Sequence, residues 1–372
     1  MQQNTKESTL PSGRDAAVAH APPGANARIL AVGTAVPEPT YTQQEVLDFF
    51  GSTDRRTSLI FLNNAIERRS LVLPPRSADG TVPEETQAEL LDKHAKVGLA
   101  VGERALRTCM ESGGLNLQDI RHLCCVTTTG LLTPGFSSLL IHRLGLRRDC
   151  SRLDVVGMGC NAGVNALSAT TSWALANPGQ LAVMVCIEIC SAAYVNESTT
   201  ETAVVNSLFG DGSAAVAIRA GDPEDSGPVL RKFASVVISE AVDAMRFDWD
   251  QNHGKFKFRL DRDVPYVVGT NAPQVIERLL DGTSVKRRDV AHWVIHSGGK
   301  KVIDAVKANL QLTSFDVRHT SSVLRDHGNL SSASFLFSYS RLLEEGRANA
   351  GDHGVLMAMG PGSSIETALI QW

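Results

Sequence analysis

The chain has 372 residues, 43% of them apolar and 20% charged, a composition typical of a globular protein with length for two core-sized units or one elaborate domain. Its formal net charge of −4 argues against a nucleic-acid surface, which needs a clustered basic excess. The longest apolar stretch, Leu181 to Ile187, ends at Glu188 and is far shorter than the ~20 residues of a membrane-spanning helix. We therefore expect no nucleic acid and no membrane among the partners.

Residues 1–26 are polar and contain alanine and proline but no apolar core segment. They are expected to form a mobile tail and do not resemble a secretion signal, so a cytoplasmic location is predicted. Seven cysteines, an odd number in a long chain, indicate reduced thiols and not a disulfide framework. One of these thiols is therefore available as a catalyst.

The first part of the chain alternates between predicted strands and helices. Apolar runs bounded by turn residues predict the strands, and apolar residues at helical spacing predict a helix over 93–106 that ends at Gly113-Gly114. A second helix follows Cys160 and stops at Pro178-Gly179. The predicted strands are 28–32, 122–128, 152–156, 181–187 and 214–219.

A polar segment with glycine and proline, Ala220 to Gly227, is the predicted boundary between two halves. It divides the chain into an N-terminal half at 27–220 and a C-terminal half at 221–372. The C-terminal half is again α/β, although no sequence repeat relates it to the first. Its predicted strands are 292–296, 355–359 and 367–372, and its predicted helices cover 302–310 and 335–343.

A glycine-rich turn, Gly157-Met-Gly-Cys-Asn-Ala-Gly163, lies between a predicted strand and a predicted helix. Backbone N–H groups and the positive end of the helix would favour a thiolate at Cys160, which makes it a candidate nucleophile. Two other interpretations stay open. Cys160 could be a buried structural cysteine. The turn also fits the loose dinucleotide-binding pattern of an NAD-dependent oxidoreductase, although no carboxylate follows at ~20 residues.

Two further segments carry polar side chains at turns. His296 ends a predicted strand before Ser297-Gly-Gly, and strand ends are where active sites of α/β proteins collect. Asn329 lies in the small-residue turn Asp326-His-Gly-Asn-Leu-Ser-Ser332 before a predicted helix. Each residue also has an ordinary interpretation, a core or surface histidine and a helix cap.

Together the three segments resemble the thiolase-fold condensing enzymes and, within them, the type III polyketide synthases. The resemblance includes the chain order of Cys160, His296 and Asn329 and extends from about Arg28 to Trp372. Further matching motifs are Leu208-Phe-Gly-Asp-Gly-Ser213, Phe258 with Asp263-Val-Pro265, His327-Gly-Asn-Leu-Ser-Ser-Ala333 and Met359-Gly-Pro-Gly362.

The resemblance implies an α/β thiolase-like fold in which two similar halves form a five-layered αβαβα core, and a homodimer. It implies an acyltransferase that uses coenzyme A thioesters as substrates, without cofactor or metal. Cys160, held as a thiolate by an ion pair with His296, would carry the acyl chain, and His296 and Asn329 would stabilise the enolate formed by decarboxylation. Phe209 and Phe258 would act as aromatic gates. Candidate cavity walls are Thr128, Thr133, Gly360, Pro361 and Gly362, and candidate coenzyme A contacts are Arg68, Arg69, Lys300 and Lys301.

Within the family, the chain is most similar to the bacterial members that make 3,5-dihydroxyphenylacetyl-CoA for glycopeptide antibiotics. The likeness includes Asp92-Lys-His94, Arg121 to Val126, Ala203 to Phe209, and Ser297 and Lys300 where plant members have proline. It implies a tetraketide built from malonyl-CoA alone, with pathway helper enzymes as possible partners. A different product remains an alternative, as does an enzyme like the β-ketoacyl-acyl-carrier-protein synthases III.

Overall fold

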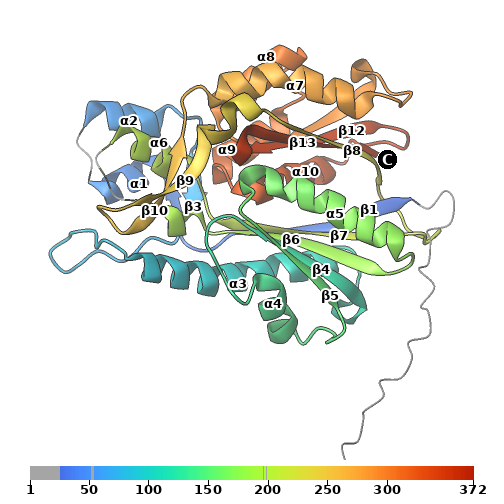
Figure 1. The fold of residues 1–372 in the computed structure, drawn as a ribbon, viewed down its shortest axis with the longest axis horizontal. Coiled ribbons are helices and arrows are strands. Elements are labelled where there is room, and N and C mark those ends of the chain that lie inside the picture. The colour runs from blue at the N-terminus through green and yellow to red at the C-terminus, as the bar shows by residue number, and fades with distance from the viewer. Residues whose placement is uncertain (1–25, 52–53, 196, 198) are drawn as a thin grey trace, which may run out of the picture.

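The computed structural model describes residues 26–51, 54–195, 197 and 199–372. The tail predicted at 1–26 lies, except for Asn26, outside the described residues. The predicted fold class is confirmed, because Figure 1 shows five layers in the order helix, sheet, helix, sheet, helix. In the described part of the chain, no helix combines the length and apolarity that crossing a membrane requires.

The two sheet layers form one hydrogen-bonded ladder of nine strands, in the order β11-β12-β13-β8-β1-β7-β6-β4-β5. A single residue pair, Arg28 with Val229, joins β1 of one half to β8 of the other. The strands are β1 (Ala27–Ala35), β4 (Ile120–Thr127), β5 (Ser151–Val156), β6 (Leu181–Glu188), β7 (Gly212–Ala220), β8 (Val229–Val237), β11 (Val290–Ile295), β12 (His353–Gly360) and β13 (Ser364–Gln371). The predicted boundary at 220–227 lies between β7 and β8, and the division into separate halves at 27–220 and 221–372 stays a prediction.

Helices fill the other three layers. One outer layer holds α3 (Gln87–Ser112) and α4 (Phe136–Leu144), and the other holds α7 (Val264–Leu280) and α8 (Lys300–Leu310) (Figure 1). Between the sheets lie α5 (Ala162–Ala176) and α10 (Ser334–Glu345), with α9 (Arg318–His327) nearby. At one end of the layers lie α1 (Gln43–Phe50), α2 (Arg55–Leu62) and α6 (Thr200–Leu208), the hairpin of β9 (Met245–Asp250) and β10 (Lys255–Leu260), and the short strands β2 (Thr40–Thr42) and β3 (Arg68–Ser70).

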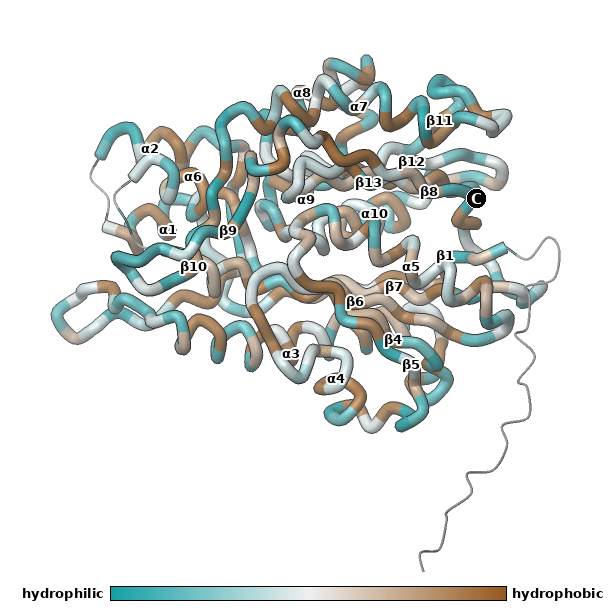
Figure 2. Tube along the Cα trace, in the orientation of Figure 1, coloured by the Kyte–Doolittle hydropathy of each residue, from teal (hydrophilic) through white to brown (hydrophobic). Residues whose placement is uncertain are grey.

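The central helix α5 follows the glycine-rich turn directly and is covered by protein on both sides. Figure 2 shows the neighbouring strands β6 and β7 as largely hydrophobic, and every residue of β6 is buried. Most of the buried residues of α5 are small, and they are Ala162, Gly163, Val164, Ala166, Leu167, Thr170, Thr171 and Ala174. A Cβ on Gly163 would lie 2.3 Å from the Ser332 carbonyl oxygen. This packing fixes the start of α5, and with it Cys160, at the centre of the molecule.

All strands and helices predicted from the sequence are present, with ends that differ by a few residues. The helix predicted at 93–106 is longer, because Thr86 caps it with a reciprocal hydrogen-bond pair to Glu89. Helix α7 was not predicted, since Pro265 and Pro273 both suggest a break. Pro265 occupies the first turn, where the missing N–H costs nothing, and the helix continues through Pro273.

Candidate active site

Cys160 lies in a one-turn 3-10 helix, Gly159–Asn161, directly before α5. Gly159 has a φ of +80°, and a Cβ there would lie 2.1 Å from Pro361 Cδ. A Cβ on Gly360 would lie 2.8 Å from the backbone nitrogen of Cys160. Glycine is therefore required on both sides of this contact. The contact brings the end of β12 against the cysteine turn, although the two are about 200 positions apart in the chain.

His296 follows β11, and its backbone N–H donates to the Met357 carbonyl at 2.8 Å. It therefore lies beside β12, the strand that ends against Cys160. Asn329 follows α9 and pairs with the chain at the end of α6. Its N–H donates to the Leu208 carbonyl at 2.9 Å, and its carbonyl accepts from the Gly210 N–H at 3.0 Å.

A series of hydrogen bonds connects Cys160 with the other two segments. The Cys160 thiol donates to Ser331 Oγ at 3.5 Å, and the Ser331 N–H donates to Asn329 Oδ1 at 2.8 Å. On the other side of Asn329, the Gly328 carbonyl accepts from Ser297 Oγ at 3.2 Å. Ser297 is the residue after His296. The structure thus connects the segments that carry the three predicted residues, which come from three distant parts of the chain.

Burial dominates the electrostatics of this site. It raises the pKa of the Cys160 thiol to about 12, although hydrogen bonds with Ser331 and Asn329 act in the opposite direction. Burial also lowers the pKa of His296 to about 3. Burial therefore opposes the thiolate that the helix end favours at Cys160, and the thiolate stays a prediction. In the enclosed site, burial thus favours the neutral forms of the Cys160 thiol and the His296 imidazole.

Cys160 opens onto a cavity of about 400 Å³ with mainly apolar walls. Phe209 and Phe258 form one wall, with ring centroids 5.6 Å apart and planes at 89°. His296 and Asn329 are 2% and 3% exposed, and neither is among the residues that line the cavity. The lining residues are Thr128, Thr129, Gly157, Gly159, Cys160, Cys190, Ala193, Tyr194, Val205, Phe209, Val242, Met245, Arg246, Phe247, Phe258, Ser331, Pro361 and Gly362.

Comparison with known proteins identifies the family. The N-terminal domain of chalcone and stilbene synthases matches residues 78–223, and their C-terminal domain matches residues 245–372. The chain belongs to the chalcone and stilbene synthase family of type III polyketide synthases. The 3,5-dihydroxyphenylacetyl-CoA synthase of Streptomyces toyocaensis is 61% identical, over 93% of this chain and 90% of that protein. The protein of the same name from Amycolatopsis orientalis is 57% identical, over 93% of each chain.

A solved structure agrees with this assignment. The C-terminal type III polyketide synthase domain of Steely1, a type I/III hybrid from Dictyostelium, superposes with a TM-score of 0.85 at 26% identity. The match covers 93% of this chain and 99% of that domain. Family membership therefore favours the condensing-enzyme interpretation of the glycine-rich turn over dinucleotide binding.

Next to Cys160 the synthase has a buried carboxyl group that the sequence analysis did not select. Glu188, the last residue of β6, accepts from the Thr128 N–H and Oγ1 and from the Ser332 hydroxyl. The Thr128 and Ser331 hydroxyls lie 2.9 Å apart, which continues the series to Cys160. Burial raises the pKa of Glu188 to about 7. In the sequence, the feature that could have indicated this residue is a single carboxylate directly after an apolar strand.

Some predicted wall residues lie elsewhere. Thr128, Pro361 and Gly362 line the cavity as predicted, whereas Thr133 is exposed and does not. Its loop leaves the cavity wall after Thr129. Gly360 does not line the cavity either, because its Cα packs on the backbone of Cys160 and Asn161.

The predicted coenzyme A contacts divide into two groups. Arg68, Lys300 and Lys301 are exposed and free to meet a phosphate, although Arg68 lies 3.7 Å from Asp326 and Lys300 lies 2.5 Å from Asp304. Arg69 was also suggested as a phosphate partner, and this suggestion is wrong. Its side chain is fully buried, and its Nε and Nη1 atoms donate to protein oxygens, whereas Nη2 has no hydrogen-bond partner among the described residues.

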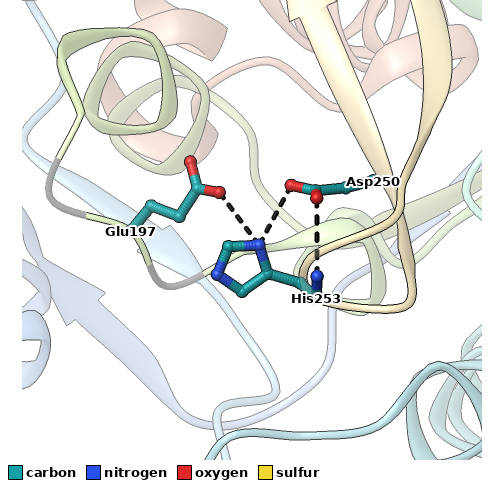
Figure 3. A group of neighbouring side chains, drawn as sticks. All are labelled: Glu197, Asp250 and His253. Carbon is teal, nitrogen blue, oxygen red and sulfur yellow. Dashed lines mark hydrogen bonds and ion pairs between the residues drawn. The ribbon is translucent and has the colours of Figure 1, made fainter.

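One group in the described residues has side chains spaced like those of a metal site. Figure 3 shows Glu197, Asp250 and His253, with His253 Nδ1 lying 3.1 Å from the Glu197 carboxylate and 3.0 Å from that of Asp250. Glu197 also pairs with the Lys257 ammonium group of β10. A cation of the chain itself therefore already faces this group, whose contacts tie the β9–β10 hairpin to the segment after β6.

Proposed function

We propose that the synthase joins malonyl units from malonyl-CoA on Cys160 and closes the resulting tetraketide to 3,5-dihydroxyphenylacetyl-CoA. The observation that carries this product is the 57–61% identity, over 93% of the chain, to synthases named for it. The apolar cavity beside Cys160 is consistent with an aromatic product of this size. Another product of the same family is the alternative.

In the first step, the Cys160 thiol attacks the thioester carbonyl of the starter unit, and coenzyme A leaves as the free thiol. Burial raises the pKa of Cys160 and lowers that of His296, which favours the neutral form of both groups before the attack. His296 would accept the thiol proton during attack and return it to the leaving sulfur, as a general base and acid. The imidazolium formed on His296 exists only until it gives the proton to the leaving sulfur, so the buried site does not keep this charge.

In the second step, an extender malonyl group loses carbon dioxide and becomes an enolate. Its oxygen requires hydrogen-bond donors that are already in place. The Asn329 amide oxygen is held by the Ser331 N–H at 2.8 Å, which leaves the amide NH₂ free to donate. The Asn329 side chain also lowers the pKa of Cys160, which is in keeping with this role. His296 would supply a second donor.

The enolate carbon then attacks the acyl group on Cys160, and the extended chain returns to the cysteine for the next round. Phe209 and Phe258 would separate the arriving coenzyme A arm from the growing chain. Closure joins the terminal carbon to the carbonyl nearest the thioester methylene, and loss of water gives the aromatic ring. Coenzyme A thioesters are the only small molecules that this scheme requires.

The assembly proposed for the synthase is a homodimer. Strand β5 supports it, because this strand ends the nine-stranded ladder and exposes Leu153 and Val156. A cytoplasmic location is proposed as well, in keeping with seven free cysteines and a coenzyme A substrate. Participation of helper enzymes stays a prediction.

The test is incubation of the purified protein with malonyl-CoA as sole substrate, followed by mass spectrometry of all products. Release of carbon dioxide and formation of 3,5-dihydroxyphenylacetyl-CoA or its acid would support the proposal. A different polyketide would keep the family chemistry and change the product. If no coenzyme A were released, even with acyl-CoA starters added, the proposed function would be refuted.

A further inference from the structure

We propose that Arg69 and Tyr194 are positioning residues that hold the Phe209 gate against the Asn329 loop and thereby set how many malonyl units are joined. This inference rests on the proposed function, because it concerns the chain length that the same cavity allows. Neither residue was selected for this role from the sequence. Both act through Phe209, and Tyr194 also lines the cavity.

Arg69 is a completely buried cation that donates hydrogen bonds to residues of α1 and α6 and to the residue after α6. Its Nη1 lies 2.8 Å from the Asn206 carbonyl and 2.5 Å from the Phe209 carbonyl, while its Nε donates to Gln43 at 2.9 Å. Burying a guanidinium is costly unless its donors are satisfied. Nη2 has no hydrogen-bond partner among the described residues, so the contacts of Nε and Nη1 are the ones that fix this buried cation.

Two of the carbonyl groups that accept hydrogen bonds from Arg69 lie at the end of α6. The last carbonyls of a helix have no partners within it, and a positive charge there also compensates the helix dipole. Arg69 donates to the Asn206 and Phe209 carbonyls. The Gln43 side-chain amide donates to the Ser207 carbonyl at 2.8 Å, and the Asn329 N–H donates to the Leu208 carbonyl. Since Phe209 directly follows α6, these contacts fix the backbone from which the gate ring projects.

Tyr194 braces the same carbonyl from the cavity side. Its hydroxyl donates to the Phe209 carbonyl at 2.5 Å and accepts from Arg69 Nη1 at 2.9 Å. Its ring lines the cavity together with the ring of Phe209. A shift of the Phe209 backbone would therefore alter both the gate and the adjacent cavity wall.

Arg69 also contacts the loop that carries Asn329. Gly328 packs on the stem of Arg69, because a Cβ on Gly328 would lie 2.7 Å from Arg69 Cδ. Residue 329 pairs with residue 209 as an isolated bridge. Arg69 therefore contacts both the backbone of the gate residue Phe209 and the loop of Asn329, the proposed hydrogen-bond donor to the enolate. If these contacts are lost, we expect extension to be interrupted and shorter chains to leave the enzyme.

The experiment compares Tyr194→Phe and Arg69→Lys with the full-length wild-type enzyme, using malonyl-CoA alone. Tyr194→Phe keeps the ring and removes the hydroxyl. Arg69→Lys keeps the charge, but a single ammonium group cannot reach all the oxygens that the planar guanidinium does. Matched controls are Tyr266→Phe and Arg288→Lys, at residues that are exposed and outside the site. Circular dichroism and acylation of Cys160, measured by mass spectrometry, verify folding and loading.

The readout is the ratio of shorter products to tetraketide product, which a general loss of stability would not change. We expect the ratio to rise by about fivefold in Tyr194→Phe, the effect of one hydrogen bond, and by more in Arg69→Lys. The controls should keep the wild-type ratio. An unchanged ratio in Tyr194→Phe would overturn the inference, whatever happens to the total rate and even if Arg69→Lys does not fold. A wild-type enzyme without tetraketide product would instead refute the proposed function.

Discussion

The substitution Glu188→Gln gives a quantitative test of the buried carboxyl group beside Cys160. Burial raises the pKa of Glu188 from an ordinary 4.5 to about 7, so the folded protein holds this proton more tightly than the unfolded chain. Its contribution to stability is complete below pH 4.5 and is lost as the pH rises through 7. Linkage gives a total loss of about 3 kcal/mol, of which about 2.5 kcal/mol falls between pH 5 and pH 8.

Glutamine has the shape of the protonated carboxyl group and does not titrate. The difference in unfolding free energy, wild type minus Glu188→Gln, should therefore fall by about 2.5 kcal/mol from pH 5 to pH 8. Urea unfolding at four pH values in this range measures the difference. Glu111→Gln, at an exposed position of α3, controls for the removal of a carboxylate. A wild-type-minus-variant difference that stays constant or increases with pH would refute the reasoning.

Three further substitutions test the site. Cys160→Ala should eliminate the acyl-enzyme mass and reduce product formation by at least about 10³-fold, and any retained chain extension would exclude Cys160 as the nucleophile. Asn329→Ala should slow release of carbon dioxide by about 10² to 10³-fold while the mass of acylated Cys160 is still observed, so a loss confined to acylation would contradict its role. Gly159→Ala places a methyl group 2.1 Å from Pro361 Cδ at a φ of +80°, and thermal unfolding should reveal a destabilisation of more than about 2 kcal/mol.

The sequence predicted an element well where burial alone determines which residue types occur along it. Strand β6 is buried along its whole length, so its apolar run was readable as a strand. Helix α9 was missed because its buried positions include His319, Thr320 and Asp326, and this removes the apolar stripe. The β9–β10 hairpin was missed because one face exposes aromatic residues, including Trp249 and Phe256.

The site was predictable in part for a similar reason. Cys160, His296 and Asn329 lie in turns whose glycines and small residues are visible in the sequence. Glu188 and Arg69 lie outside such turns, and their roles depend on partners more than 100 positions away, such as Ser332 and Phe209. The pKa of Cys160 could not be predicted, because the local helix end favours the thiolate whereas enclosure by the whole fold disfavours it.

The cavity walls differ in how easily they can change during evolution. Around Cys160 they are built from backbone contacts such as Gly159 on Pro361 and Gly360 on Cys160, where an added methyl group does not fit. Three other wall residues, Val242, Arg246 and Phe247, are exposed to solvent. New products should therefore arise mainly by substitutions in and before β9, and mutant libraries restricted to this segment should yield functional variants far more often than libraries around the cysteine turn.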